Sequence, residues 1–287
     1  MFESLKRKSK AEVIVFIAVF IIFAIYAASL LYIPIFTVLN SLKTPTQYYD
    51  DSFGLPTQWQ FINYARALEE LTVEGSGFWE MTLNSFWWAF GHVFFNLVPI
   101  ILFSYVIMRF RFPGREFLLI LNYISIIVTV YGSQSADYVY FAELGVLNTP
   151  WLVVCAIGGF GTTTLIVMSF MESLSWGYAE AAEIDGANEF TIFLQIYVPL
   201  IFPIIATLAL TKFIGTWNDY YGPLLYMEDY PTLASGLYEY RLYSVERKGN
   251  YPIYFAGMLI TLAPVLVLYT AFSDVIMKNM GIGGLKG

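Results

Sequence analysis

The first long apolar stretch of this chain, VIVFIAVFIIFAIYAASLLYIPIFTVLNSL from Val13 to Leu42, decides its fold class. It contains no Asp, Glu, Lys or Arg, and it is longer than the ~20 apolar residues that a helix needs to cross the hydrocarbon core of a bilayer. It is also longer than the apolar region of a secretory signal peptide, and no small-residue cleavage site follows at a suitable distance. We therefore expect it to stay in the protein as a membrane-spanning helix.

Five further windows are free of acidic and basic residues and long enough to span. One of them is shortened in its apolar part, because residues 132–136 have the composition of a loop. The sequence therefore predicts an all-α polytopic membrane protein with six transmembrane helices. The five windows are Ser85–Met108, Phe117–Ala136, Leu144–Met171, Phe190–Thr211 and Tyr251–Ser273.

Composition supports this class and excludes others. The 287 residues are 58% hydrophobic and 13% charged, with a net charge of −7, which argues against a cytosolic enzyme, a disordered chain and a nucleic-acid binder. A single cysteine, Cys155, and a single histidine, His92, exclude a disulfide framework and the common zinc motifs. No Gly-Lys dipeptide occurs, so the chain has no Walker A loop. We expect no catalytic residues, metal or cofactor. If the protein does energised work, we expect the energy to come from an ion gradient or from another chain.

Basic residues predict the orientation of the helices. Lys and Arg gather at the N-terminus, at residues 109–115 and in the C-terminal tail, while fewer lie on the opposite side. By the positive-inside rule both termini are expected in the cytoplasm. This places two large loops outside, at residues 44–81 and 219–250.

The longest cytoplasmic loop, Glu172–Glu189, breaks that rule because it contains acidic residues and no Lys or Arg. Ala179–Ile184 are mostly good helix formers. Gly186 can adopt a positive φ and end the helix, and Asp185 or Asn188 can cap the next one. We expect a helix–turn–helix at the membrane surface. It is either an ordinary connector or a docking element, with Ala181 and Ala182 as a small contact face and Glu180 and Glu183 facing basic groups of a partner.

The spacing within this loop favours docking. Glu180-Ala181-Ala182, Gly186 and Ile196-x-Val198-Pro199 resemble, at matching intervals, the EAA loop of bacterial ATP-binding-cassette (ABC) importer permeases, with Val198 in place of the usual leucine. Other segments resemble the carbohydrate (maltose-type) branch of that family. They are Pro56, Asn63-Tyr64, Asn84-Ser85, Tyr105, Arg109, Phe112–Arg115, Leu147–Thr149, Trp217-Asn218, Pro223-Leu224 and the tail Gly283–Gly287.

The resemblance implies a function and a set of partners. The chain would be one permease domain over residues 1–287 in the bacterial inner (plasma) membrane, carrying a sugar or oligosaccharide by alternating access. It would pair with a second, non-identical permease, two ATP-binding subunits and an extracytoplasmic solute-binding protein. The loop at residues 172–196 would hold a coupling helix between spans four and five, which docks on the ATPase. The coupling residues would be Glu180, Ala181, Ala182, Glu183, Asp185, Gly186 and Pro199.

The solute path is less clearly marked than the coupling loop. Polar and aromatic side chains near the outer ends of spans two and five are candidates, because sugars need hydrogen-bonding groups and aromatic faces. Lys212 either snorkels outward or faces a polar path, and His92 is either a path residue or a packed neutral histidine. Cys155 is expected to be a packing residue. The candidate path residues are Asn84, Lys212, Trp217, Asn218 and Tyr221.

A different class of transporter remains as the alternative. An ion-coupled secondary transporter would draw energy from a gradient, but it needs acidic coupling groups within its spans. The six predicted windows reach spanning length without one.

Overall fold

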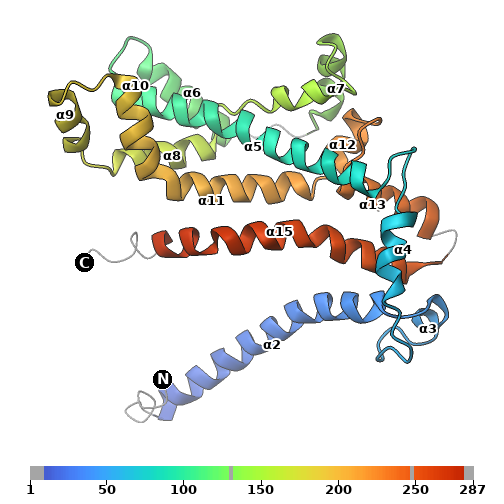
Figure 1. Cartoon of the computed structure of the whole chain (residues 1–287). Helices are drawn as coiled ribbons and strands as arrows, with labels where there is room; N and C mark the ends of the chain where they lie inside the picture. Colours follow the sequence, from blue (N-terminus) through green and yellow to red (C-terminus); the bar gives the residue numbers. More distant parts are fainter. Residues whose placement is uncertain (1–9, 129–131, 246–248, 281–287) are drawn as a thin grey trace. The chain divides into compact units, whose positions relative to one another are not determined.

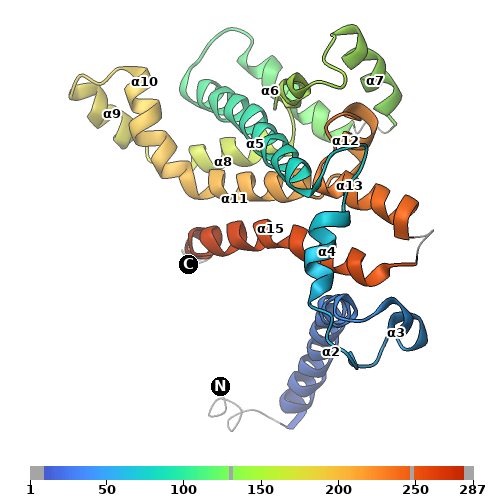
Figure 2. The same ribbon diagram turned by 45° about the vertical axis from the view of Figure 1, so that its right-hand side comes forward.

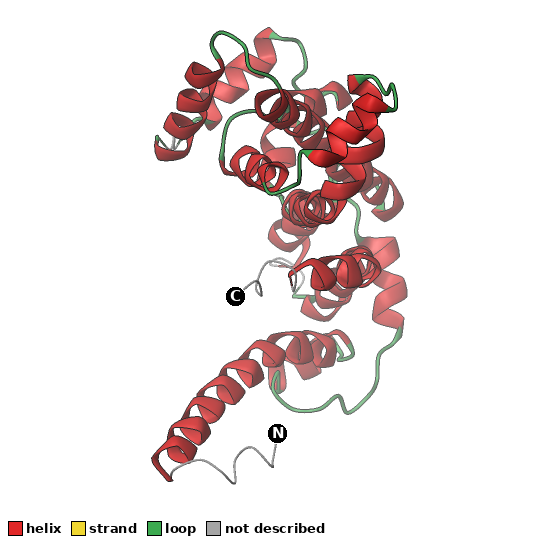
Figure 3. Cartoon of the chain, turned by 90° about the vertical axis from the view of Figure 1, so that its left-hand side faces the viewer, coloured by secondary structure: helices red, strands yellow, loops and turns green. Residues whose placement is uncertain are grey.

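The computed structural model describes residues 10–128, 132–245 and 249–280. The basic residues Lys6–Lys8, Arg247 and Lys248 and the tail Gly283–Gly287 lie outside this described part. Within it, every regular element is helical (Figure 3), which confirms that the fold is all-α. Four helical segments in this part are long and apolar enough to cross a membrane: Ala11–Ser41, Phe78–Arg109, Glu189–Trp217 and Tyr251–Ser273.

The other two predicted windows are each divided among shorter elements. Helices α6 (Arg115–Ile127) and α7 (Gln134–Glu143) occupy the region of 117–136, separated at the loop-like residues around Gly132, whose φ is +76°. The 3₁₀ helix η1 (Pro150–Ala156) and α8 (Thr162–Glu172) occupy the region of 144–171. Gly158, Gly159 and Gly161 separate them, since glycine is unfavourable inside a helix. At 1.5 Å per residue, α6 and α8 are each only about 16–20 Å long.

The chain divides into two compact units, each described here by itself. The first contains the chain up to Leu71 and Tyr240–Ile260. It holds α2 (Lys10–Ser41), α3 (Pro45–Asp50), α4 (Ile62–Glu70), the π-helix η3 (Arg241–Val245) and the start of α15 (Tyr251–Met280). Most side chains of α2 are exposed, as expected of a helix whose surroundings are lipid.

Hydrogen bonds from Asn63 fix the end of α2 in this unit. The buried Asn63 side chain donates from Nδ2 to the carbonyls of Ser41, at 2.8 Å, and Lys43, at 2.9 Å. The Ser41 carbonyl is at the last residue of α2 and the Lys43 carbonyl lies just beyond it, where intrahelical partners run out. The fully buried Lys43 donates from Nζ to the Asp51 carbonyl at 2.8 Å. The Asn63-Tyr64 pair singled out in the sequence is therefore a structural tie between α4 and the end of α2.

The second unit contains Thr72–Glu239 and the chain from Thr261. Helix α5 (Phe78–Arg109) packs against η1, α8 and α11 (Val198–Trp217), and Figures 1 and 2 show α5 beside α8 and α11. Short elements complete the unit: α9 (Gly177–Ile184), α10 (Glu189–Ile192), the π-helix η2 (Phe193–Tyr197), α12 (Tyr221–Tyr226) and α13 (Leu233–Tyr240).

One apolar core joins these helices. Leu97, Ile100 and Ile101 of α5 pack with Val167 and Met171 of α8 and with buried residues of the α10–α11 segment, including Ile192 and Ile201. At ~25 cal/mol per Å² of apolar surface, this contact is a main source of stability for the bundle. It also sets the position of the loop between α8 and α10, because the core continues into α9.

Candidate functional site

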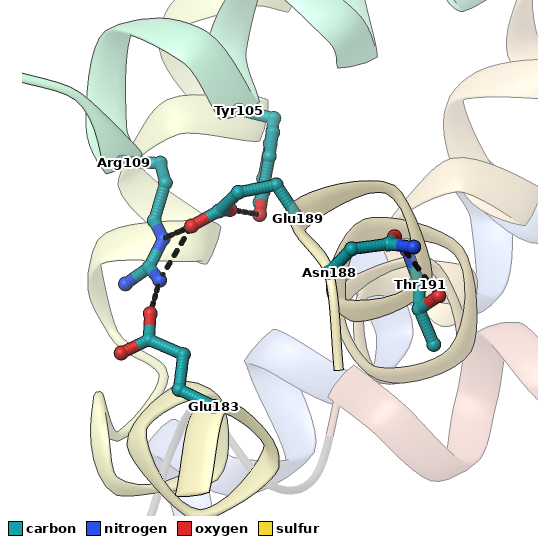
Figure 4. Close-up of polar contacts among 6 residues, drawn as sticks. All are labelled: Tyr105, Arg109, Glu183, Asn188, Glu189 and Thr191. Carbon is teal, nitrogen blue, oxygen red and sulfur yellow. Dashed lines mark hydrogen bonds and ion pairs between the residues drawn. The ribbon is translucent and has the colours of Figure 1, made fainter. Parts of the chain in front are cut away.

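The loop between α8 and α10 has the helix–turn–helix form predicted from the sequence. Helix α9 spans Gly177–Ile184, and Gly186 follows it with φ +83°, a value that glycine adopts at little cost. Asn188 then caps α10, since its Oδ1 accepts a hydrogen bond from the backbone N–H of Thr191 at 2.8 Å (Figure 4). Asn188, and not Asp185, is thus the capping residue.

Helix α9 has an inner and an outer face. Ala179 is fully buried in the core beside α8, and Ala182 packs against the same core. Glu180, Ala181 and Asp185 are exposed. Ile184 is 86% exposed, a large fraction for an isoleucine, which is usually buried. The two alanines expected to form one small face therefore point differently: Ala182 inward and Ala181 outward.

Arg109, the last residue of α5, holds both arms of this loop. Its Nε lies 3.2 Å from each carboxylate oxygen of Glu189 on α10, and its Nη2 donates to Glu189 Oε1 at 2.8 Å. Nη2 also donates to Glu183 on α9. Tyr105, one turn earlier on α5, donates its hydroxyl to Glu189 Oε2 at 2.8 Å. We call Tyr105, Arg109, Glu183 and Glu189 the clamp (Figure 4).

The clamp is well shielded on its cationic side. The Arg109 side chain is only 12% exposed, whereas the Glu183 and Glu189 side chains are 47% and 44% exposed. The Arg109 guanidinium also lies 5.8 Å from the centre of the Trp176 ring, within cation–π range. A planar guanidinium that binds a carboxylate through two nitrogens neutralises its charge and also fixes its orientation.

The sequence contained a usable signal for the clamp. Tyr105 and Arg109 are four residues apart and therefore share one face of α5. Both stand in the segment that resembles the importer family, but the acidic partners were not paired with them, and Glu183 was expected to face another protein. In the structure its carboxylate contacts Arg109 of the same chain.

Pro199 lies where the loop enters the long helix. It occupies the first turn of α11, directly after the π-helix η2. The helical segment is continuous from Glu189 to Trp217, so Pro199 lies inside it, where the missing N–H interrupts the intrahelical hydrogen bonds and favours a kink or π-bulge. Pro199 therefore marks the junction between η2 and α11.

A second polar feature is a cleft of about 560 Å³ among α5, α8 and α11. Ionisable groups on its wall are His92, Lys212 and Asp219. His92 Nε2 is buried without a hydrogen-bond partner among the described residues, and the centre of its ring lies 4.1 Å from that of the Trp88 ring. The other residues lining the cleft are Asn96, Leu97, Thr163, Leu208, Thr211, Gly215 and Thr216.

Lys212 alone of the candidate path residues lines the cleft. The buried Asn84 donates from Nδ2 to the Pro231 carbonyl at 3.0 Å and accepts from Trp87 Nε1 at 3.1 Å. The buried Trp217 donates from Nε1 to the Thr261 carbonyl at 3.1 Å. Asn84 thus joins α5 to the segment before α13, and Trp217 joins α11 to α15.

The remaining two candidates lie near the outer end of α11. Asn218 is exposed and donates to the Ile214 carbonyl of its own helix at 2.9 Å. Tyr221 is 48% exposed, and its backbone N–H donates to Asp219 Oδ1 at 3.0 Å. Neither residue lines the cleft.

The described residues contain no group of three or more His, Cys, Asp or Glu side chains placed to hold a metal ion. Cys155 is half-buried in η1 and is 63 positions from His92, the chain's single histidine.

Comparison with known proteins links this architecture to a group of transport proteins. The family model described as binding-protein-dependent transport system inner membrane component matches residues 11–281. The probable ABC transporter permease protein YurM of Bacillus subtilis is 23% identical over 279 residues, 94% of this chain and 88% of that protein. The diacetylchitobiose uptake system permease protein NgcG of Streptomyces coelicolor is 28% identical over 259 residues, 88% of this chain and 83% of that protein.

One solved structure shares the fold. It is a crystal structure of a bacterial ABC transporter involved in the import of the acidic polysaccharide alginate. One of its chains superposes with a TM-score of 0.80 at 21% identity, over 93% of this chain and 98% of that chain.

Proposed function

The chain belongs to the family of binding-protein-dependent transport system inner membrane components, the permeases of ABC importers, and we propose that α9 couples it to an ATP-hydrolysing partner chain. It is a multi-pass protein of the bacterial cell membrane. The observation that carries the coupling proposal is the outer face of α9, where Glu180, Ala181 and the 86%-exposed Ile184 lie side by side at a helical surface.

The topology we propose has six spans with both termini in the cytoplasm. Four spans are the long apolar helices. The other two would be made from the regions of α6–α7 and η1–α8, each of which combines shorter elements. This topology places α9 and the clamp on the cytoplasmic side, where ATP is available, and it fits the basic residues at 109–115.

The clamp supports a mechanical role for α9. Because Arg109 binds Glu183 and Glu189, a displacement of α9 is passed to the end of α5 as well as to α10 and α11. The outward residues Glu180, Ala181 and Asp185 would contact the ATPase, while Ala182, Glu183 and Gly186 hold the loop in shape. Pro199 marks the junction between η2 and α11, through which a movement of the loop would reach α11.

Alternating access follows from this arrangement. Closure of an ATPase dimer would bring two coupling helices together, turn the attached spans and open the path outward, and hydrolysis would reset it. The solute shifts the equilibrium between the inward-open and outward-open states only to the extent that its affinities for the two states differ. We propose a heterodimer with a second permease, two ATP-binding subunits below and an extracytoplasmic solute-binding protein above.

The proposed solute is a sugar or oligosaccharide. The names of the relatives and the alginate transporter support this class, as does a cleft lined by hydroxyl, amide and charged groups. Of the earlier candidates, Lys212 is in the cleft, and we propose that Asn218 and Tyr221 lie nearer its outer mouth. Asn84 and Trp217 are proposed to shape the path indirectly through the helices that they join.

Reconstitution tests the proposal. The complete importer in proteoliposomes should take up solute only when ATP is supplied on the side of the membrane that carries the ATPase. Uptake should not depend on a proton or sodium gradient. Glu180→Arg should reduce uptake while the complex still inserts and assembles. Uptake that persists with a hydrolysis-deficient ATPase partner would instead favour the ion-coupled secondary transporter.

A further inference from the structure

Lys212 is a cation at the wall of the cleft whose charge no contact neutralises. Its side chain is half-buried and forms no salt bridge or hydrogen bond with the described residues. Asp219 and His92 lie within electrostatic range of it, but neither makes an ion pair with it. An ionisable residue in a membrane helix normally faces a bundle interior or a watery cavity and marks a pathway.

We propose that this cleft is the chain's solute contact site, and that Lys212 selects saccharides that carry a carboxylate, such as uronic acids, over neutral sugars. The proposal rests on the proposed function as a sugar permease and deepens it by naming the substrate class.

The other groups of the cleft suit the remainder of such a ligand. Asn96, Thr211 and Thr216 offer amide and hydroxyl groups. Asp219 accepts hydrogen bonds at Oδ1 from the backbone N–H groups of Tyr221, at 3.0 Å, and Gly222, at 3.1 Å. Its Oδ2 accepts none from the described residues, so it can accept from sugar hydroxyls.

The charge balance favours a carboxylate over a phosphate. The cleft has one ammonium, from Lys212, and one carboxylate, from Asp219. A monoanion can pair with the ammonium at one end while its hydroxyls meet Asp219. A phosphate ester carries nearly two negative charges at neutral pH, and the second would be repelled by Asp219.

The size of the cleft and its mixed polar and apolar lining also fit a sugar, which has both hydroxyl groups and apolar C–H faces. About 560 Å³ lies within the ~300–1,000 Å³ usual for small-molecule sites. Only Leu97 and Leu208 bring large apolar side chains to the lining. A lipid tail in this space would leave several polar groups without partners, which is costly in hydrocarbon.

A single introduced thiol can report occupancy of the cleft. Cys155 is the only cysteine, so Cys155→Ala removes the native thiol. Gly215 lines the cleft, and a Cβ added there meets nothing within 4 Å, so Gly215→Cys adds a thiol without crowding. In the complete importer, the rate at which a neutral maleimide labels this chain is read by mass spectrometry.

Three probes differ at one carbon: galacturonate, galactose and galactose 6-phosphate. We expect galacturonate to protect the thiol at about fivefold lower concentration than galactose, the effect of one partly screened ion pair. Lys212→Met should abolish the difference, and Lys212→Arg should keep it.

Equal protection by galacturonate and galactose, better protection by the phosphate, or protection by none of the three would overturn the proposal. So would an unchanged preference in Lys212→Met. These outcomes are separable from failure of the proposed function, because ATP-driven uptake and its loss in Glu180→Arg are measured without reference to the charge of the sugar.

Discussion

Arg109 and Glu189 meet through two nitrogens and two oxygens, with Arg109 Nη2 2.8 Å from Glu189 Oε1 and Arg109 Nε 3.2 Å from Glu189 Oε2. They stand at the end of α5 and the start of α10. With Glu183 on the same guanidinium, one side chain joins three helices at the point where the loop leaves the bundle. Coupling through α9 would therefore depend on α5 as much as on α11.

Arg109→Met should uncouple ATP hydrolysis from uptake. The apolar chain retains much of the packing but removes the arginine contacts of Glu183 and Glu189, which leaves Glu189 bound only to Tyr105 among the clamp residues; because both carboxylates are nearly half exposed, the cost is about 1 kcal/mol. We expect uptake per ATP hydrolysed to fall several-fold in proteoliposomes, with assembly retained.

Arg109→Lys is the informative control for the clamp. Lysine keeps the charge but cannot present the planar fork, so an intermediate loss is expected. Glu116→Gln removes a carboxylate that pairs with a different arginine, Arg115; it lies outside the clamp and should leave coupling unchanged. Normal coupling in Arg109→Met would exclude a mechanical role for the clamp.

The sequence predicted the local structure of the α9 loop well because its signals are local. Gly186 and Asn188 act through their own backbone and the next turn, so their roles follow from residue type and spacing. The family match over residues 11–281 confirms the resemblance that was drawn from this spacing.

The clamp and the cleft could not be predicted in the same way, because they depend on residues far apart in sequence. Tyr105 and Glu189 are 84 residues apart, and no spacing rule pairs them. Asn84 and Trp217 have the chemistry of path residues. Their hydrogen bonds to the carbonyls of Pro231 and Thr261 are tertiary contacts, which the sequence alone does not reveal. The division of η1 from α8 at Gly158, Gly159 and Gly161 was likewise not visible in the hydropathy windows, whereas the loop-like composition of residues 132–136 was.

Gly186→Ala should destabilise the loop through its backbone alone. The φ of +83° costs an alanine about 1–2 kcal/mol, while the added Cβ would meet nothing within 4 Å. We expect lower ATPase coupling and faster amide hydrogen exchange in residues 177–192. Gly186→Asn should reduce coupling less than Gly186→Ala, because asparagine tolerates a positive φ better than alanine. If the two variants lose coupling equally, the backbone conformation is not the cause, and the loss comes from reduced flexibility or a side-chain clash with a partner.

Gly158 and Gly159 provide a matched pair for the packing of η1 and α8 on α5. A Cβ at Gly158 would collide with the backbone oxygen of Asn96, whereas one at Gly159 meets nothing within 4 Å. Gly158→Ala should therefore lower the thermal unfolding temperature by several degrees, consistent with about 1–3 kcal/mol for overpacking. Gly159→Ala should change it little. If both variants unfold alike, the close approach to α5 does not stabilise the fold.

Burial of Lys43 makes stability depend on pH. Desolvation lowers the pKa of Lys43 below its ordinary 10.5, although Asp51 opposes this. Between the lowered and the ordinary value the unfolded chain binds more protons, so the Lys43 contribution to stability rises with pH across that window. Lys43→Met should remove this rise. Between pH 8 and pH 10, the unfolding temperature of the native chain should therefore increase relative to that of the variant. A gap independent of pH would contradict the assignment.

Ile184 tests whether the outer face of α9 is a docking surface. At 86% exposure its side chain contributes little to the fold, so Ile184→Ser should leave the unfolding temperature within the small range usual for surface changes, about ±0.5 kcal/mol. If the residue is buried by a partner, the same change should weaken ATPase binding by about 1–3 kcal/mol. Binding of the purified ATPase to the permease pair, measured at several ATPase concentrations, gives the value, and Ile184→Leu should bind normally. Equal affinity of native and serine chains would remove Ile184 from the interface and leave Glu180 and Ala181 as its remaining outward contacts.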